Sequence, residues 1–227
     1  SEMCIRDRHR IITFGLGNDN DYFATNIKVK NGGVDFTVNI KNKGSYDARL
    51  NVLGEHNVRN ALVAIAVAER HGIEVTEAIK ALAGYEGVSM RQQITDVNGV
   101  TIIDDSYNAS PDSMKAGIDV LCDYNNNGRK IAVLADMLEL GDKSADYHKE
   151  VGGYMAEKKI DELILFGTMA ANIGDGFNGS YKLFKKREEI NEYLLKNLKS
   201  GDAILFKGSR GMKLNECVDF LKENYNG

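Results

Sequence analysis

The sequence has 227 residues, of which 43% are apolar, and this is enough for one or two domains with ordinary buried cores. Its formal net charge is −4 and no block of like charges forms a tail, so nucleic acid is not an expected partner. No apolar run approaches the roughly 20 residues that a membrane-spanning helix needs. The three cysteines lie far apart without metal-binding spacing, which fits a reducing, cytoplasmic location.

The beginning of the chain differs from the rest. Residues 1–10 have neither apolar periodicity nor a helix cap, so we expect a non-native or disordered leader there. A short strand is predicted at 11–14. Strands at 22–30, 34–40 and 46–52 then form a small antiparallel meander, because apolar and polar residues alternate along them.

A helix rich in alanine and valine is predicted at 58–71, and a shorter one at 76–83. Asn57 and Asn60 lie three residues apart at the start of the first helix, on one face. A helix start carries free N–H groups and suits a polar ligand. Asn57 could equally be a simple N-cap residue.

The stretch 84–93 has two glycines and no periodicity, and the pattern changes after it, so we place a boundary between domains 11–89 and 90–227. The second domain alternates strands and helices, which predicts an α/β fold with a mostly parallel sheet and flanking helices. Strands are expected at 93–97, 100–104, 130–135, 161–166, 181–184 and 203–206. Helices are expected at 111–125, 143–158, 168–174, 187–199 and 213–224.

The most informative stretch is 104–121, DDSYNASPDSMKAGIDVL. Two carboxylates end a buried strand, a polar loop follows, and a helix begins with Ser110 as N-cap and Pro111 at its first position. Open α/β sheets bind ligands at the carboxyl ends of their strands. The alternative is a well-capped helix behind an acidic strand end.

Two further polar loops follow strands, at 135–141 and 207–211. In a parallel sheet these loops and the one after Asp105 converge on one edge. The loop Lys-Gly-Ser-Arg-Gly could hold an anion such as a carboxylate or a phosphate, although it could also be only a basic turn. His148, on the following helix, is expected on the helix surface and not as a ligand.

Four segments resemble successive motifs of the Mur ligase family: GEHNVRNALVAIAVA, DDSYNASPDSMKAGIDVL, VLADMLELGDKSADYHKEVG and KGSRGM. The resemblance runs in family order from about Ile11 to Leu221. It is strongest to the MurF type, which adds D-alanyl-D-alanine to UDP-N-acetylmuramoyl-tripeptide. The Asp-Ser-Tyr-Asn-Ala and Asp-Met-Leu-Glu-Leu-Gly motifs separate this type from other Mur ligases and from folylpolyglutamate synthetases.

The resemblance implies an ATP-dependent, cytoplasmic, monomeric ligase of peptidoglycan precursor synthesis that uses ATP and Mg²⁺. Its substrate carboxylate becomes an acyl phosphate, which the amine of the dipeptide attacks. It also implies that 90–227 is a Rossmann-like carboxyl-terminal domain, and that 11–89 is the truncated end of a P-loop-type central domain.

The resemblance further implies roles for individual residues. Asn57 and Asn60 match the adenine side of ATP, and Arg91 matches the arginine at the phosphates, the one implied catalytic residue. Asp105 matches the residue near the ribose, and Tyr107 continues that wall of the cleft. The residues implied for substrate binding are Asn108, Asp136, Glu139, Lys207, Ser209 and Arg210.

The sequence also departs from the family pattern. It contains no G-x-x-x-x-G-K-[ST] loop, and the main ligands of phosphate and magnesium are expected upstream of Ile11. The chain alone is therefore expected to be inactive. Ala135 stands where glycine is usual, which is harmless only if its φ is negative. The alternatives are a stand-alone module that binds a dipeptide or a nucleotide, and a related amino-acid ligase.

Overall fold

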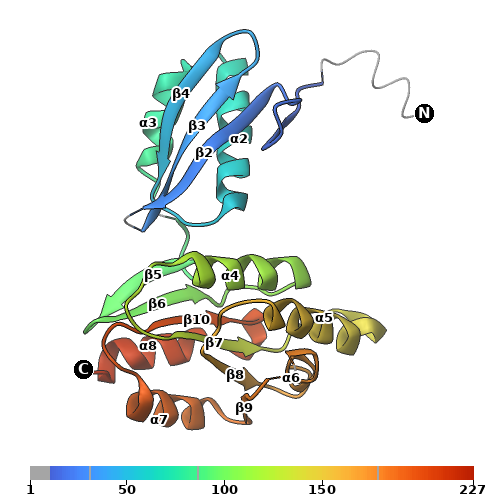
Figure 1. Ribbon diagram of the computed structural model, residues 1–227, viewed down its shortest axis with the longest axis vertical. Helices are drawn as coiled ribbons and strands as arrows, with labels where there is room; N and C mark the ends of the chain where they lie inside the picture. Colours follow the sequence, from blue (N-terminus) through green and yellow to red (C-terminus); the bar gives the residue numbers. More distant parts are fainter. Residues whose placement is uncertain (1–10, 31, 86, 178) are drawn as a thin grey trace. The chain divides into compact units, whose positions relative to one another are not determined.

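The computed structural model describes residues 11–227 except 31, 86 and 178 (Figure 1). The leader expected at 1–10 lies outside the described residues. The chain divides into two compact units, residues 1–86 and 87–227, and each is considered by itself. No helix in the described part of the chain is both long and apolar enough to cross a membrane.

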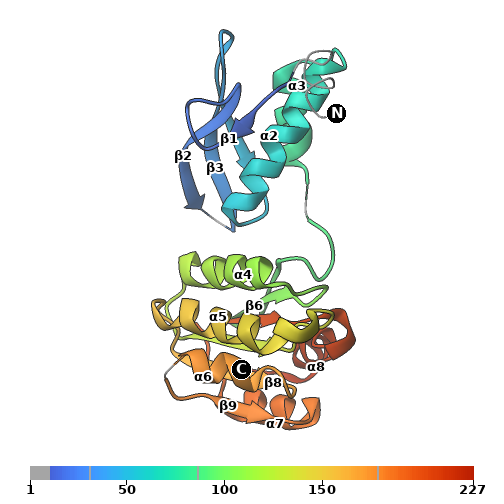
Figure 2. The same ribbon diagram turned by 90° about the vertical axis from the view of Figure 1, so that its right-hand side faces the viewer.

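The first unit is a four-stranded sheet with two helices. The sheet order is β1-β2-β3-β4, with β1 parallel to β2 and the other pairs antiparallel. Alternate side chains of β3 are buried, and Figure 2 shows both helices on one face of the sheet. The elements are β1 (Phe14–Gly15), β2 (Tyr22–Lys30), β3 (Gly33–Ile40), β4 (Gly44–Leu50), α2 (Glu55–Arg70) and α3 (Val75–Ala83).

Three elements of this unit have other boundaries than predicted. The strand predicted at 46–52 runs from Gly44 to Leu50, because the turn before it is tight enough for Ile40 to pair with Gly44. The strand predicted at 11–14 is reduced to Phe14–Gly15, because the Asp21 side chain accepts a hydrogen bond from the Thr13 N–H (2.9 Å) in place of a ladder partner. Helix α2 begins at Glu55, three residues before the predicted start. Its N-cap is Gly54, whose φ of 95° favours glycine. Because glycine has no side chain to cap the helix, the sequence carries no cap signal at this position.

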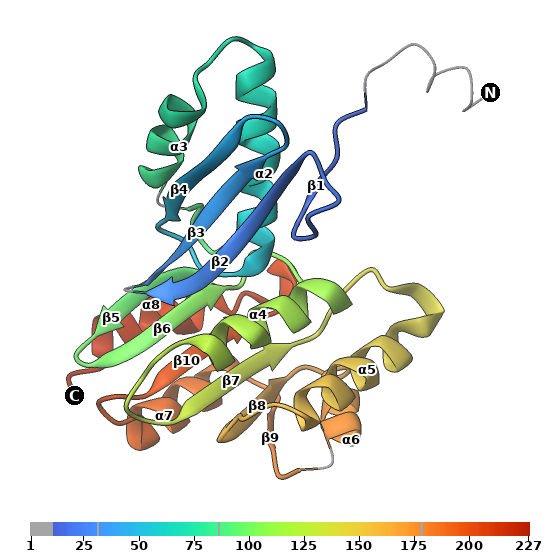
Figure 3. The ribbon, with the colours of Figure 1, turned by 45° about the horizontal axis from the view of Figure 1, so that its top comes forward.

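The second unit is a six-stranded sheet with helices on both faces, as predicted. The order is β5-β6-β10-β7-β8-β9; β5 is antiparallel to β6, and all other pairs are parallel (Figure 3). Its strands are β5 (Gln93–Val97), β6 (Val100–Asp105), β7 (Lys130–Ala135), β8 (Glu162–Phe166), β9 (Lys182–Phe184) and β10 (Ala203–Lys207). Its helices are α4 (Pro111–Asp123), η1 (Gly141–Lys143), α5 (Ser144–Ala156), α6 (Ala171–Phe177), α7 (Arg187–Asn197), η2 (Arg210–Met212) and α8 (Asn215–Asn224).

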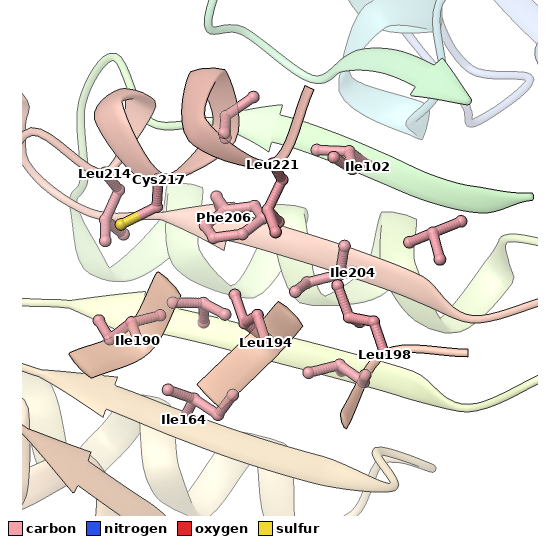
Figure 4. Close-up of a cluster of buried hydrophobic side chains, with 14 of the residues drawn as sticks. Ile102, Ile164, Ile190, Leu194, Leu198, Ile204, Phe206, Leu214, Cys217 and Leu221 are labelled. Carbon is pink, nitrogen blue, oxygen red and sulfur yellow. The ribbon is translucent and has the colours of Figure 1, made fainter. Parts of the chain in front are cut away.

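The core of the second unit lies on either side of the central strand β10. On one face, Ile204 and Phe206 pack against side chains of α7 and α8, among them Leu194 and Leu221 (Figure 4). Because successive side chains of a strand point to opposite faces, Lys207 faces the other layer, where α4 covers β10 and β7. This alternation decides which polar side chains at the strand ends can meet.

Candidate functional site

The three polar loops leave the same edge of the second unit's sheet, as predicted. Strands β6, β10 and β7 are neighbours, and Lys207 is in register with Asp105 on one side and with Leu134 on the other. Their loops therefore start side by side at the carboxyl ends of parallel strands, where this sheet type places ligands. We call this edge the rim: it consists of the loops 105–110, 135–141 and 207–211 together with Arg91, whose guanidinium lies over the Tyr107 ring of the first loop.

The ends of β6 and β10 are joined by a buried ion pair. The Lys207 Nζ donates to the Asp105 Oδ2 at 2.6 Å and to the carbonyl oxygen of Asn108 at 3.2 Å, and Lys207 is only 2% exposed. Helix α4 packs closely against this pair at Gly117. A larger residue would not fit there, because a Cβ on Gly117 would lie 2.8 Å from the Lys207 Cδ. The cation of Lys207 is therefore balanced within the protein, and it fixes the loop that carries Tyr107 and Asn108.

The neighbouring carboxylate, Asp104, points to the opposite face and has different surroundings. Its Oδ1 accepts hydrogen bonds from the backbone N–H (3.1 Å) and the hydroxyl (2.5 Å) of Ser106. Burial raises the pKa of Asp104, and the bonds from Ser106 offset this only in part. The helix start that follows is confirmed: Ser110 is the N-cap in a capping box with Ser113, and Pro111 is the first residue.

Asp136 is buried beneath the rim and is bound to backbone. Its carboxylate accepts from the N–H groups of Thr168 (3.2 Å) and Ala170 (2.7 Å), and the residue is 7% exposed. Gly167 allows this close approach, since a Cβ there would lie closer than 3.0 Å to the Asp136 carboxylate. Asp136 thus ties the loop after β7 to the loop after β8.

Ser209 connects the loops after β10 and β7. Its hydroxyl accepts from the Leu138 N–H (2.8 Å), its own N–H donates to the Asp136 carbonyl (3.1 Å), and the residue is 5% exposed. Ala135, at the end of β7, is absent from the described residues with positive φ, so alanine is accommodated where the family pattern has glycine.

His148 was predicted on the surface of its helix, and this was wrong: its exposed fraction is 0%. Its Nε2 lies 2.9 Å from the Met137 backbone nitrogen, and its Nδ1 lies 2.7 Å from the Ser144 carbonyl oxygen. The burial of His148 could not be predicted from the sequence, because helical periodicity places only apolar residues in the core. His148 is buried because the loop after β7 has a backbone N–H that needs an acceptor.

The exposed part of the rim carries charge of both signs. The Arg91 and Arg210 guanidinium carbons lie 4.3 and 5.4 Å from the centre of the Tyr107 ring. Within the described ranges, neither arginine forms an ion pair with a carboxylate, and no lysine or arginine pairs with Glu139. The Tyr107 N–H donates to the Met90 carbonyl (3.0 Å), which holds the ring near Arg91.

Asn57 and Asn60 belong to the first unit and are described apart from the rim. Asn57 is the third residue of α2 and not its N-cap; its Nδ2 donates to the Leu53 carbonyl at 2.7 Å. Asn60 is exposed on the first turns of the same helix. Both therefore lie at the amino end of α2.

No three His, Cys, Asp or Glu side chains gather as possible metal ligands within the part of the chain that the structure describes. No residue of that part is accordingly assigned to Mg²⁺.

Comparison with known families identifies both units. The model for the Mur ligase glutamate ligase domain matches residues 90–210, and the model for the Mur ligase middle domain matches residues 2–68. The chain belongs to the Mur ligase family. The resemblance predicted from the four motifs is thereby confirmed.

Individual Mur ligases give the same result. The chain is 38% identical over 222 residues to the UDP-N-acetylmuramoyl-tripeptide--D-alanyl-D-alanine ligase of Bacillus subtilis, covering 93% of this chain and 47% of that protein. It is 34% identical over 214 residues to the Escherichia coli ligase of the same name, covering 91% and 45%. A crystal structure of MurF from Acinetobacter baumannii superposes with a TM-score of 0.86 at 31% identity, covering 96% and 48%. The chain thus spans about half the length of the curated Mur ligases that it matches.

Proposed function

We propose that this chain is part of an ATP-dependent ligase that adds D-alanyl-D-alanine to UDP-N-acetylmuramoyl-tripeptide in peptidoglycan precursor synthesis. The names of its relatives in Bacillus subtilis and Escherichia coli support this activity. The observation that carries the proposal is the exposed rim, where Glu139, Arg91 and Arg210 lack partners of opposite charge among the described residues. We infer that the enzyme is a monomer in the cytoplasm. The free thiols of Cys122 and Cys217 support the cytoplasmic location, since disulfides are rare in a reducing compartment.

The rim fits a zwitterionic dipeptide. A dipeptide brings one ammonium and one carboxylate, and we assign the ammonium to Glu139 and the carboxylate to Arg210, whose guanidinium can bind a carboxylate through two hydrogen bonds. Glu139 is preferred to Asp136 because both carboxylate oxygens of Asp136 already accept backbone N–H groups. Asn108, exposed in the neighbouring loop, supplies an amide for the peptide group.

Arg91 is assigned to the nucleotide side of the same rim. ATP, when bound, supplies the phosphoryl group that activates the substrate carboxylate, and Mg²⁺ belongs with its phosphates. Arg91 offers an exposed cation that stabilises negative charge on oxygen as it develops. Tyr107 keeps Arg91 and Arg210 on one ring, so the two charges stay near each other.

The other residues of the implied set have supporting roles in this proposal. Asn57 and Asn60 present their amides at the amino end of α2 and suit the adenine ring. Asp105 and Lys207 act as a pair, because their contact fixes the loop of Tyr107 beside the nucleotide side. Asp136 and Ser209 hold the loop of Glu139 from below.

The test is a chimaera in which residues 11–227 replace the matching half of the Bacillus subtilis ligase. Phosphate release that requires ATP, UDP-N-acetylmuramoyl-tripeptide and D-alanyl-D-alanine together is the expected result. A soluble chimaera without this activity, beside an active parent enzyme, contradicts the proposal. The same assay with L-glutamate or D-alanine in place of D-alanyl-D-alanine tests for a related amino-acid ligase, because such an enzyme would release phosphate with one of these amino acids.

Calorimetry on the 227-residue chain separates the ligase from a binding module. We expect D-alanyl-D-alanine to bind the chain, and Arg210→Gln to weaken that binding about tenfold or more, which is the effect of removing a charge-assisted hydrogen bond. Arg187→Gln is the matched control, because Arg187 pairs with Glu216 at 2.8 Å on the helices α7 and α8. Dipeptide binding without ligation by the chimaera would favour the stand-alone module.

A further inference from the structure

The loop after β7 is held through two successive backbone N–H groups. The Met137 N–H meets the Nε2 of His148 on α5, and the Leu138 N–H meets the hydroxyl of Ser209 after β10. Both amides lie beyond the last ladder residue of β7, where no neighbouring strand offers a carbonyl. Two elements far apart in the sequence therefore supply the acceptors that this loop lacks.

These acceptors fix the backbone directly before Glu139. Glu139 has a φ of 63°, a left-handed conformation that residues other than glycine seldom adopt. Such a conformation persists only where the surrounding structure enforces it. On the amino-terminal side of Glu139, the hydrogen bonds of the Met137 and Leu138 amides hold this conformation in place. On the carboxyl-terminal side, Gly141 has a φ of 62°, which glycine adopts without steric cost.

The contacts of His148 define its protonation. A backbone N–H can only donate, so the Nε2 that faces Met137 must carry the lone pair. The proton of the neutral imidazole is then on Nδ1, where it is donated to the Ser144 carbonyl at 2.7 Å. A ring protonated on both nitrogens would turn an N–H towards the Met137 N–H and lose this bond.

We propose that His148, as a neutral imidazole with its proton on Nδ1, is a positioning residue for the incoming amine. It binds the Met137 amide and thereby sets the direction in which the loop presents Glu139. The part that concerns the dipeptide rests on the proposed function, whereas the tautomer and the loop contact do not. His148 does not touch the dipeptide in this proposal and takes no proton from it.

The test compares His148→Gln with His148→Leu in the 227-residue chain. The glutamine Oε1 can take the place of Nε2 as acceptor, whereas leucine fills the space without one. Nitrogen-15 spectra of wild type should report a protonated Nδ1 and an unprotonated Nε2 for His148, with the exposed His71 as internal reference. In His148→Leu we expect hydrogen exchange at Met137 to rise about tenfold more than at Leu205 of the core, and dipeptide affinity to fall by a similar factor.

A control variant separates positioning from general loss of stability. The Asn126 side chain binds carbonyls at the opposite edge of the sheet, so Asn126→Ala destabilises the same unit without touching the rim. We expect it to raise exchange at Met137 and Leu205 equally and to leave dipeptide affinity unchanged. Ser209→Ala supplies a second probe, in which exchange at Leu138 rises selectively.

Each result bears on the proposal. Restoration of both slow Met137 exchange and dipeptide affinity by His148→Gln, but not by His148→Leu, supports it. A proton on Nε2 in wild type, or equal behaviour of the two variants, overturns it. If wild type shows the expected tautomer and exchange but does not bind D-alanyl-D-alanine, the proposed function fails while the loop contact stands.

Discussion

Glu139 and Asp136 lie three residues apart in one loop but have different surroundings. Glu139 is exposed and has no cationic partner among the described residues, whereas Asp136 is buried and accepts two backbone N–H groups. We therefore expect Glu139→Gln to weaken binding of D-alanyl-D-alanine about tenfold without a change in stability. Asp136→Asn should cost about 2 kcal/mol of unfolding free energy, since an amide NH₂ cannot accept the N–H groups that the carboxylate does.

Calorimetric titration and chemical denaturation of the two variants make this comparison directly. Glu157→Gln, an exposed change at the far end of α5, controls for the loss of one negative charge. If the Glu139→Gln variant binds the dipeptide as tightly as wild type does, Glu139 is not the partner of the dipeptide's ammonium group.

The ionisation of Asp104 should make the protein less stable as the pH rises, whereas most carboxylates of folded proteins make it more stable. Its folded-state pKa is raised, chiefly by burial, so the folded state holds the proton more tightly than the unfolded chain. Its contribution is thus most favourable at low pH, and it declines as the pH rises above the unfolded value of about 4 towards the raised folded value.

Asp104→Asn removes this dependence and keeps an oxygen for the two bonds from Ser106. We expect the unfolding free energy of the variant to gain on that of wild type between pH 4 and pH 7. Urea unfolding at several pH values measures the difference. A difference that is constant with pH, or that moves the other way, would show that Asp104 titrates as an ordinary carboxylate.

The residue types of the rim could be predicted from the sequence, but their exposure could not. Lys207, Ser209 and Asp136 stand at strand ends in a motif that suits a ligand, yet their polar groups bind the protein itself. Strand alternation and loop partners, which decide this, depend on which strands become neighbours. His148 escaped prediction for the same reason, because its partner is a backbone amide eleven residues away.

At the scale of elements, the packing of α5 on α6 depends on one of two adjacent glycines. A Cβ on Gly152 would lie closer than 3.0 Å to backbone atoms of Ile173 and Phe177, whereas a Cβ on Gly153 meets nothing within 4 Å. Gly152→Ala should therefore destabilise the second unit by about 3 kcal/mol through overpacking. Gly153→Ala should stabilise it by about 0.5–1 kcal/mol, since glycine is unfavourable inside a helix.

Thermal and urea unfolding of the two variants test this pair, which differs only in position on the helix. Equal effects of the two alanines would mean that α6 does not approach α5 as closely as described.

Most elements could be predicted because their hydrophobic periodicity agrees with their final surroundings. Helix α4 carries a full set of local signals, Ser110 and Pro111 at its start, and its start was predicted to the residue. The start of α2 was misplaced because Gly54 caps it without a side chain. The first strand was overestimated because the Asp21 side chain, a long-range partner, takes the Thr13 N–H.

At the scale of the molecule, the two units should differ in stability. The second unit covers its sheet on both faces, whereas α2 and α3 cover one face of the smaller first sheet (Figure 2). A smaller unit buries a smaller fraction of its surface on folding. Val38 and Leu205 are both 0% exposed, yet we expect the Val38 amide to exchange at least about tenfold faster than the Leu205 amide.

Hydrogen exchange measured by NMR at neutral pH compares the two amides within one sample. Equal protection would mean that the units unfold together as one cooperative system, in spite of their separate cores.

The place of β10 has a consequence for the order of assembly. Residues 203–207 lie between β6 and β7, so the strand that comes last in the chain order of this sheet completes its middle. Until it emerges from the ribosome, β6 and β7 cannot be joined, and Asp105 has no Lys207 to meet. Pairing over such a sequence separation raises contact order and slows folding. A nascent chain therefore carries two exposed strand edges while the residues between β7 and β10 are made, and the sheet of the second unit can close only after Lys207.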